Sequence, residues 1–296
     1  MNILLVVIGI VFVLLLLSLL ATTIMELIAS AFSLRGKNLE AALRNLLASS
    51  DIDEKLLATF KENALYRQLS SRFGSKRVSP SYLSPESFQS ILFDVILKGE
   101  GLEKLESKIE ELPDMDLKNV LKQLLRDADN RLDNFKLKIN TWYNDVMDRA
   151  TGWYKRSTQK ILIGVGLAIA VTFNADSISI FARLWQDPAL TAQIADMAET
   201  FVEQNPGDTL RPVDPDFNQS YQELQNLMDN HITAVKAPLG LGWYTADFVG
   251  YDAYDWLIKG LGWIVTALAI SLGAPFWFDL LKRLVSIRSS GKKPGE

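Results

Sequence analysis

Apolar residues are concentrated in three stretches of the chain, Ile3–Ala31, Ile161–Trp185 and Trp256–Leu281. A helix needs roughly 20 apolar residues to span a bilayer core of about 30 Å, because each residue adds about 1.5 Å. All three stretches are long enough. The first carries no charge before Glu26 and lacks the basic start and cleavage site of a signal peptide, so we expect a retained span. A buried core helix is the alternative for the other two.

The charged segment after the first stretch has helical periodicity. Leucines at intervals of three and four predict amphipathic helices within 36–50 and 53–69. A basic loop rich in Pro and Ser begins at Ser70. Ser84 and Pro85 then form the pattern of a helix start, with a side-chain cap followed by proline in the first turn.

A longer apolar stripe, in steps of three and four, runs from Leu117 to Trp153. No proline occurs between Asp114 and Trp185, so we expect one helix, on the order of 100 Å long, to continue into the second span. The stripe packs against the short helices of the same domain, or part of it self-associates as a coiled coil. Beyond the second span, the sequence predicts two further helices, within residues 187–204 and 215–231.

The distribution of Lys and Arg near the ends of the spans predicts the orientation. Basic residues follow the first span, precede the second and follow the third, whereas the segment between the last two is acidic. We therefore expect an all-α membrane protein with three transmembrane helices, an outside amino terminus, and a cytoplasmic middle domain and carboxyl terminus. Its predicted parts are a first transmembrane helix (1–32), a helical cytoplasmic domain (33–158), a second transmembrane helix (159–185), an outer acidic helical loop (186–255), a third transmembrane helix (256–281) and a basic cytoplasmic tail (282–296).

Five polar residues lie within or at the edges of the spans: Glu26, Asn174, Asp176, Lys259 and Asp279. Ionisable groups at membrane depth are costly and need partners. The predicted topology pairs Asp176 with Lys259 near the outer side and leaves Glu26 and Asp279 near cytoplasmic basic residues. We expect ion pairs that fix the packing of the helices. The lining of a small pore in an oligomer is the alternative.

Aromatic and basic residues flank the spans, where amphipathic rings and long basic stems favour the headgroup zone. We expect them to be interfacial anchors. For the group on the long helix, binding of acidic lipids is an additional role. Pro275 is expected to kink the third span. The aromatic segment 237–256 either lies along the outer interface or docks a partner. The predicted anchors are Trp142, Trp153, Tyr154, Lys155, Arg156, Phe276, Trp277, Phe278, Lys282 and Arg283.

Composition limits the available chemistry. The chain has no cysteine and a single histidine, His231, which excludes disulfides, thiolate chemistry and His-rich metal clusters. No phosphate-binding loop, nucleophile elbow or zinc-protease motif occurs. The net charge of −4 does not suggest nucleic-acid binding. We expect no enzymatic activity, no cofactor and no metal site.

The strings GWYKRSTQ (152–159), NADSISIFARLWQDPAL (174–190) and LGAPFWFDLLKRL (272–284) together resemble an uncharacterised family of bacterial three-span membrane proteins. The resemblance implies a multi-pass protein of the bacterial cell membrane, the inner one where two are present, and brings no activity with it. We therefore expect a non-enzymatic membrane anchor or scaffold that presents its helical cytoplasmic domain to other copies or to a membrane complex. The alternative is an oligomeric channel-forming or membrane-perturbing protein.

Overall fold

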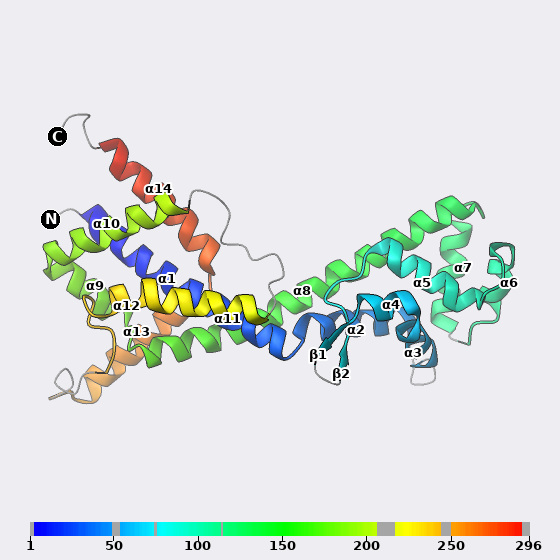
Figure 1. Ribbon diagram of the computed structural model, residues 1–296, viewed down its shortest axis with the longest axis horizontal. Helices are drawn as coiled ribbons and strands as arrows, with labels where there is room; N and C mark the ends of the chain where they lie inside the picture. The colour runs from blue at the N-terminus through cyan, green and yellow to red at the C-terminus, as the bar shows by residue number, and fades with distance from the viewer. Residues whose placement is uncertain are drawn as a thin grey trace. The chain divides into compact units, whose positions relative to one another are not determined.

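The computed structural model describes residues 3–48, 54–73, 76–113, 115–205, 217–243 and 250–291. The chain forms two compact units. Unit 1 comprises Met1–Ala31 and Thr158–Glu296, and unit 2 comprises Phe32–Ser157. The described residues are predominantly helical, as predicted (Figure 1). Parts of the predicted outer segment 237–256 and of the basic tail lie outside the described residues.

Unit 2 consists of short helices, a small hairpin and the first part of the longest helix. Ser84 caps α5 by accepting a hydrogen bond from Ser87 N at 3.1 Å, and Pro85 is the first helical residue, as predicted. The elements are α2 (Leu34–Leu47), α3 (Glu54–Glu62), α4 (Ala64–Leu69), β1 (Ser71–Phe73), β2 (Lys76–Val78), α5 (Pro85–Leu97), η2 (Leu102–Lys104), α6 (Leu105–Glu110), α7 (Met115–Arg126) and the start of α8 (Leu132–Thr172).

The segment that follows Ser70 was predicted as a loop, but it contains the antiparallel pair β1–β2, in which Arg72 lies opposite Arg77. Strands of three residues are too short to give a recognisable alternation of apolar and polar positions, so the pattern does not reveal them.

Unit 2 has its own hydrophobic core, in which aromatic rings link the helices. Phe88 of α5 stacks on Tyr143 of α8 with ring centroids 4.5 Å apart and also contacts Phe60 of α3 at 5.6 Å. Tyr143 donates a hydrogen bond to the backbone oxygen of Leu83 at 2.7 Å. At the edge of the core, the ammonium group of Lys61 holds the pKa of Glu40 below its usual value.

The change Tyr143→Phe tests that hydrogen bond. It keeps the stacking on Phe88 but leaves a buried carbonyl oxygen without its donor, so we expect the free energy of unfolding to fall by about 1–3 kcal/mol. Denaturant titration followed by circular dichroism measures the loss. Tyr82→Phe is the matched control, because Tyr82 is exposed and its change should be neutral. Equal effects of the two changes would contradict the assigned role.

The predicted continuous helix from Asp114 to Trp185 is wrong at two points. First, α7 ends at Arg126 and α8 begins only at Leu132, because Asp129 and Asn130 adopt left-handed backbone conformations with φ of 53° and 54°. Asp and Asn tolerate this region better than most residues. Apolar periodicity continues across the break and hides it.

The second break lies inside the predicted second span. Helix α8 has 41 residues, about 60 Å at the helical rise, and does enter the apolar stretch as predicted. It ends at Thr172, and α9 (Ser177–Gln186) follows after a bend of 50°.

In unit 1, helices surround α1 (Ile3–Ala31), as Figure 1 shows. The predicted outer segment contains the two predicted helices, α10 and α11. The elements that follow α9 are α10 (Pro188–Gln204), α11 (Phe217–Asn226), the π-helix η3 (Leu227–Ile232), α12 (Thr233–Lys236), α13 (Ala253–Ile270) and α14 (Ala274–Gly291). Two described helices, α1 and α13, are long and apolar enough to cross a membrane, and the bent pair α8–α9 is a third if counted as one span.

The predicted third span also breaks. Helix α13 ends at Ile270, Gly273 has φ of 87°, and α14 starts at Ala274. Pro275 therefore does not kink a continuous helix. It lies in the first turn of a new one, where its missing N–H costs nothing.

Contacts between α10 and α14 disagree with the predicted sidedness. Arg288 Nη2 of α14 lies 2.7 Å from Asp196 Oδ1 of α10, and Arg288 Nη1 lies 3.3 Å from Glu199 Oε2. Helix α10 belongs to the predicted outer loop and Arg288 to the predicted cytoplasmic tail. A placement of these two segments on opposite sides of a membrane is incompatible with this ion pair.

Candidate functional site: a buried polar cluster between α8, α9 and α13

The break between α8 and α9 is stabilised by its own backbone. Asn174 adopts a left-handed conformation with φ of 49°, Ala175 N donates to Ala170 O at 2.7 Å, and Asn174 N donates to Val171 O at 3.0 Å. This is the Schellman pattern of a helix end. Trp243 Nε1 also donates to Val171 O at 2.8 Å. The carbonyl groups of Ala170 and Val171 therefore have partners in an apolar region.

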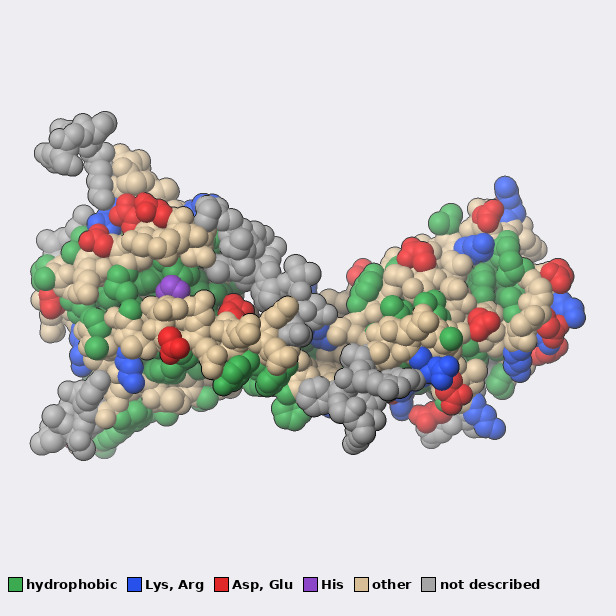
Figure 2. Space-filling model, viewed as in Figure 1, with side chains coloured by type: hydrophobic (Ala, Val, Ile, Leu, Met, Phe, Trp, Pro, Cys, Tyr) green, Lys and Arg blue, Asp and Glu red, His purple; other side chains and the backbone are tan. Residues whose placement is uncertain are grey.

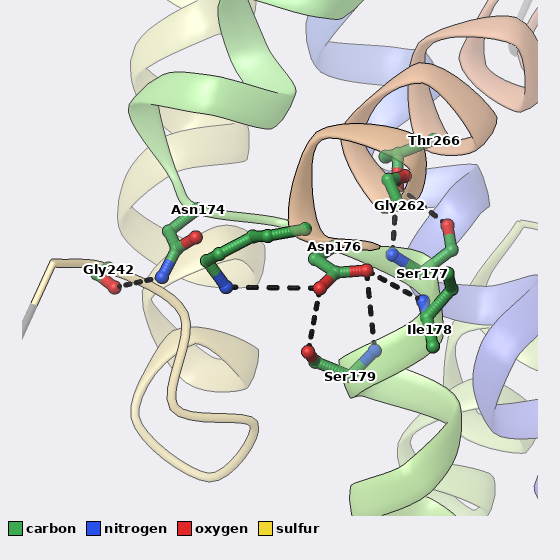
Figure 3. Close-up of polar contacts among 9 residues, drawn as sticks. Asn174, Asp176, Ser177, Ile178, Ser179, Gly242, Gly262 and Thr266 are labelled. Atoms are coloured by element: carbon green, nitrogen blue, oxygen red, sulfur yellow. Dashed lines mark hydrogen bonds and ion pairs between the residues drawn. The ribbon is translucent and has the colours of Figure 1, made fainter. Parts of the chain in front are cut away.

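Asp176 starts α9 and is the centre of the cluster. One carboxylate oxygen accepts from Ile178 N at 2.9 Å, and the other accepts from Ser179 Oγ at 2.7 Å (Figure 3). Lys259 Nζ of α13 lies 3.8 Å from Asp176 Oδ2, so the predicted pair is present. The two residues are only 2% and 6% exposed. The carboxylate thus faces both a helix amino terminus and an ammonium group.

Helix α13 contacts the start of α9 through small and hydroxyl side chains. Thr266 Oγ1 accepts from Ser177 N at 3.0 Å, lies 2.7 Å from Ser177 Oγ, and donates to Gly262 O at 2.9 Å. Any side chain at Gly262 would collide with the Asp176 carboxylate. The glycine therefore allows the acid to lie directly against the backbone of α13.

Asn174 connects the cluster to the segment before α13. Its Nδ2 donates to Gly242 O at 2.9 Å, while its buried Oδ1 has no hydrogen-bond partner among the described residues. Asn174, Asp176, Arg183, Tyr251 and Lys259 contribute to the lining of a cavity of about 230 Å³. A cavity of this size with polar walls can hold water or a small polar group.

The other two predicted polar residues are not part of this cluster. Glu26 is partly buried in α1, and its negative charge contributes to a raised pKa of Glu223 in α11, for which burial is the larger cause. Asp279 lies exposed on α14. His231 of η3 makes an edge contact with Phe201 at 5.3 Å, and burial lowers the pKa of its imidazole.

Of the predicted anchors on α8, Trp142 packs against Phe88 of the unit 2 core at 6.2 Å, because it shares the inward face of α8 with Tyr143. Trp153, Lys155 and Arg156 are exposed on α8, and Tyr154 lines a cavity of about 310 Å³ in unit 2. Their role as membrane anchors stays a prediction.

The anchors predicted around the third span also include both exposed and buried side chains. Phe276, Lys282 and Arg283 are exposed, whereas Trp277 and Phe278 are buried in the core of unit 1. Trp277 Nε1 donates to Ala269 O at 2.7 Å and so caps the end of α13. These two rings face protein because the chain turns at Gly273.

Sequence reasoning missed Ser177, Ser179, Gly262, Thr266 and Trp243 as members of the cluster. A signal for the start of α9 was present, since an Asp directly before an apolar run is typical of a helix start. The Gly and Thr spaced by four on α13 also place two small or hydroxyl side chains on one helix face.

Within the described part of the chain, no three His, Cys, Asp or Glu side chains come together as a metal site requires. The fold and the cluster define a helical protein with two or three helices that are able to cross a membrane. Comparisons with protein-family models, with curated proteins and with solved structures found no match.

Proposed function

We propose that this protein is an integral membrane anchor or scaffold. In this proposal unit 1 is held in the bilayer of a bacterial cell, and unit 2 is presented as a folded helical domain to other copies of the chain or to a membrane complex.

The separate core of unit 2 is the observation that carries the proposal. Phe88, Phe60 and Tyr143 pack together within residues 32–157 and need no side chain from unit 1. The surface of this unit carries ion pairs, for example Lys122 of α7 with Glu110 of α6, that suit contact with water. A domain of this kind on a membrane protein has a free surface on which partners can dock.

Unit 2 also exposes isolated large apolar side chains. Met115 at the start of α7 and Leu137 on α8 are 63% and 65% exposed. Apolar side chains of this type commonly become buried when proteins associate. They are suitable positions for detecting a partner.

A photo-crosslinking amino acid at position 115 or 137 of the full chain tests the proposal in native membranes. We expect discrete adducts from both positions, either at a multiple of the chain's own mass or with one shared partner. The matched control is Glu203, which is exposed on α10 of unit 1 and should give no such adduct. Absence of adducts at both unit 2 positions, together with a monomeric mass in detergent, would contradict the proposal.

The alternative, an oligomeric channel, requires polar groups that open to a lumen. Asp176 and Lys259 are instead enclosed by helices of their own chain, which supports the anchor over the channel. Purified protein in liposomes should therefore give no ion flux. A reproducible flux would favour the channel.

A further inference from the structure

Helix α13 turns its apolar side chains outward and its polar side chains inward, which is the reverse of the arrangement in a water-soluble protein. Its inward face carries Lys259, Gly262 and Thr266, which are buried against Asp176 and Ser177. Every exposed side chain between Gly260 and Ile270 is apolar. This outward stripe consists of Leu261, Ile264, Val265 and Leu268, with Trp256 and Leu257 continuing it toward the start of the helix. In water, such a helix would turn the opposite face outward.

The neighbouring helices extend the same surface. The last turns of α8 carry no charge between Ile161 and Thr172 and expose Ile163, Leu167 and Val171 at intervals of four. Helix α9 exposes Ile178, Phe181 and Trp185 at intervals of three and four.

The helices that form this surface approach closely. A Cβ at Gly166 of α8 would lie 3.1 Å from Ala267 O of α13, so little space separates the two helices. Gln159 Nε2 donates to Ser271 O at 2.7 Å at the far end of the same pair. We call the exposed apolar side chains of α8, α9 and α13 in unit 1 the outer apolar face. Figure 2 shows hydrophobic side chains along the lower edge of unit 1, where α8 and α13 run.

The most apolar helix of the chain does not contribute to that face. All side chains of α1 from Val11 to Ala21 are buried among other helices. On the side of α10 and α14 the covering helices carry charges such as Asp196, Glu199 and Arg288. Figure 2 shows acidic side chains gathered over α10. Unit 1 therefore has an apolar surface and a charged surface, with α1 between them.

An aromatic group lies at one end of the outer apolar face. Trp243 and Trp256 stack with centroids 6.5 Å apart, and Tyr251 contacts Trp256 edge-on at 5.8 Å. All three rings are substantially exposed. Indole and phenol rings concentrate where hydrocarbon meets headgroups. From Trp256 to Ile270 the stripe extends about 21 Å, which is shorter than a bilayer core, and local thinning is one way in which a bilayer adapts to a short span.

We infer that the hydrocarbon of a lipid bilayer covers the outer apolar face, and that α1 is shielded from lipid by the other helices of unit 1. The inference rests on the membrane location in the proposed function. Lipid fits better than a second copy of the chain, because protein interfaces combine an apolar centre with a polar rim. From Lys259 to Ile270, the polar groups of α13 beside this face are directed inward.

A bilayer that contains a phospholipid with a diazirine in its acyl chain tests the inference on the unmodified full chain. After illumination, adducts are mapped by mass spectrometry. We expect severalfold more adduct per residue on α13 and the last turns of α8 than on residues 11–21 of α1. Predominant labelling of α1 would overturn the inference but leave the anchor function intact, whereas absence of adducts from all of unit 1 would overturn the membrane location itself.

A single cysteine distinguishes lipid from a second copy, and the chain has no other cysteine to interfere. Ile264→Cys places a spin label on the outer apolar face, and Gln193→Cys places one on the exposed, charged side of α10. In liposomes the label at 264 should be reached by oxygen and not by a water-soluble nickel chelate, and the label at 193 should behave in the opposite way. Strong dipolar broadening at 264 would mean that a second copy covers the face, and would overturn the inference.

Discussion

Replacing Asp176 with alanine should strongly destabilise the protein, because the ammonium group of Lys259 then stays buried without the Asp176 carboxylate. Removal of one partner from a buried pair costs about 3–5 kcal/mol. The same change removes the cap of α9, which adds about 1 kcal/mol. Unfolding of the full chain in detergent micelles, followed by circular dichroism, measures the sum.

Asp187→Ala is the matched control, since Asp187 caps α10 in the same way, through Ala189 N and Leu190 N at 3.0 Å, but is exposed. It should lose only the capping contribution of about 1 kcal/mol. In the double variant Asp176→Asn with Lys259→Met, the buried charge is absent and most of the lost stability should return. If Asp176→Ala were no more harmful than Asp187→Ala, the buried pair would have no special importance.

The second large effect is expected at Gly262, where even a methyl group would collide with the Asp176 carboxylate. Gly262→Ala should force α13 away from the start of α9 and disturb the hydrogen bonds of Thr266 to Ser177. Overpacking of this kind costs about 1–3 kcal/mol, and the carboxylate cannot move without weakening its contact with Lys259.

Gly260→Ala is the control for this effect, because nothing lies within 4 Å of a Cβ at that position on the same helix. Alanine favours a helix over glycine by up to about 1 kcal/mol, so the control should be neutral or stabilising. The same micelle unfolding measurement applies to both variants. A Gly262→Ala protein as stable as the Gly260→Ala protein would show that the close approach of α9 and α13 is not required.

The sequence predicted features that depend on local chemistry. Helical periodicity and the start of α5 at Ser84 and Pro85 follow from the spacing of a few residues. The pairing of Asp176 with Lys259 follows instead from the similar depths that the predicted topology gives to the two residues. The breaks at Asn174 and Gly273 were missed, because an apolar run continues across both and composition alone does not distinguish a bent pair of helices from one span.

Other features depend on the packing of distant segments. The burial of Trp277 and Phe278, and the contact of Arg288 with α10, result from the return of α14 along α1. Hydropathy ranks α1 as the strongest candidate for lipid contact. Hydropathy depends on the composition of a helix alone and does not show which other helices pack around it. The direction in which a helix turns its apolar side chains is set by the tertiary structure.

The two faces of α13 also restrict how its sequence can drift. On the outward side, Leu261, Ile264 and Leu268 are about half exposed, so other aliphatic residues should serve nearly as well at these positions. On the inward side, the size of Gly262 and the hydroxyl group of Thr266 are fixed by the atoms they touch. Random variation along this helix would therefore be confined to the positions that are most hydrophobic, while its few small and polar residues would change least.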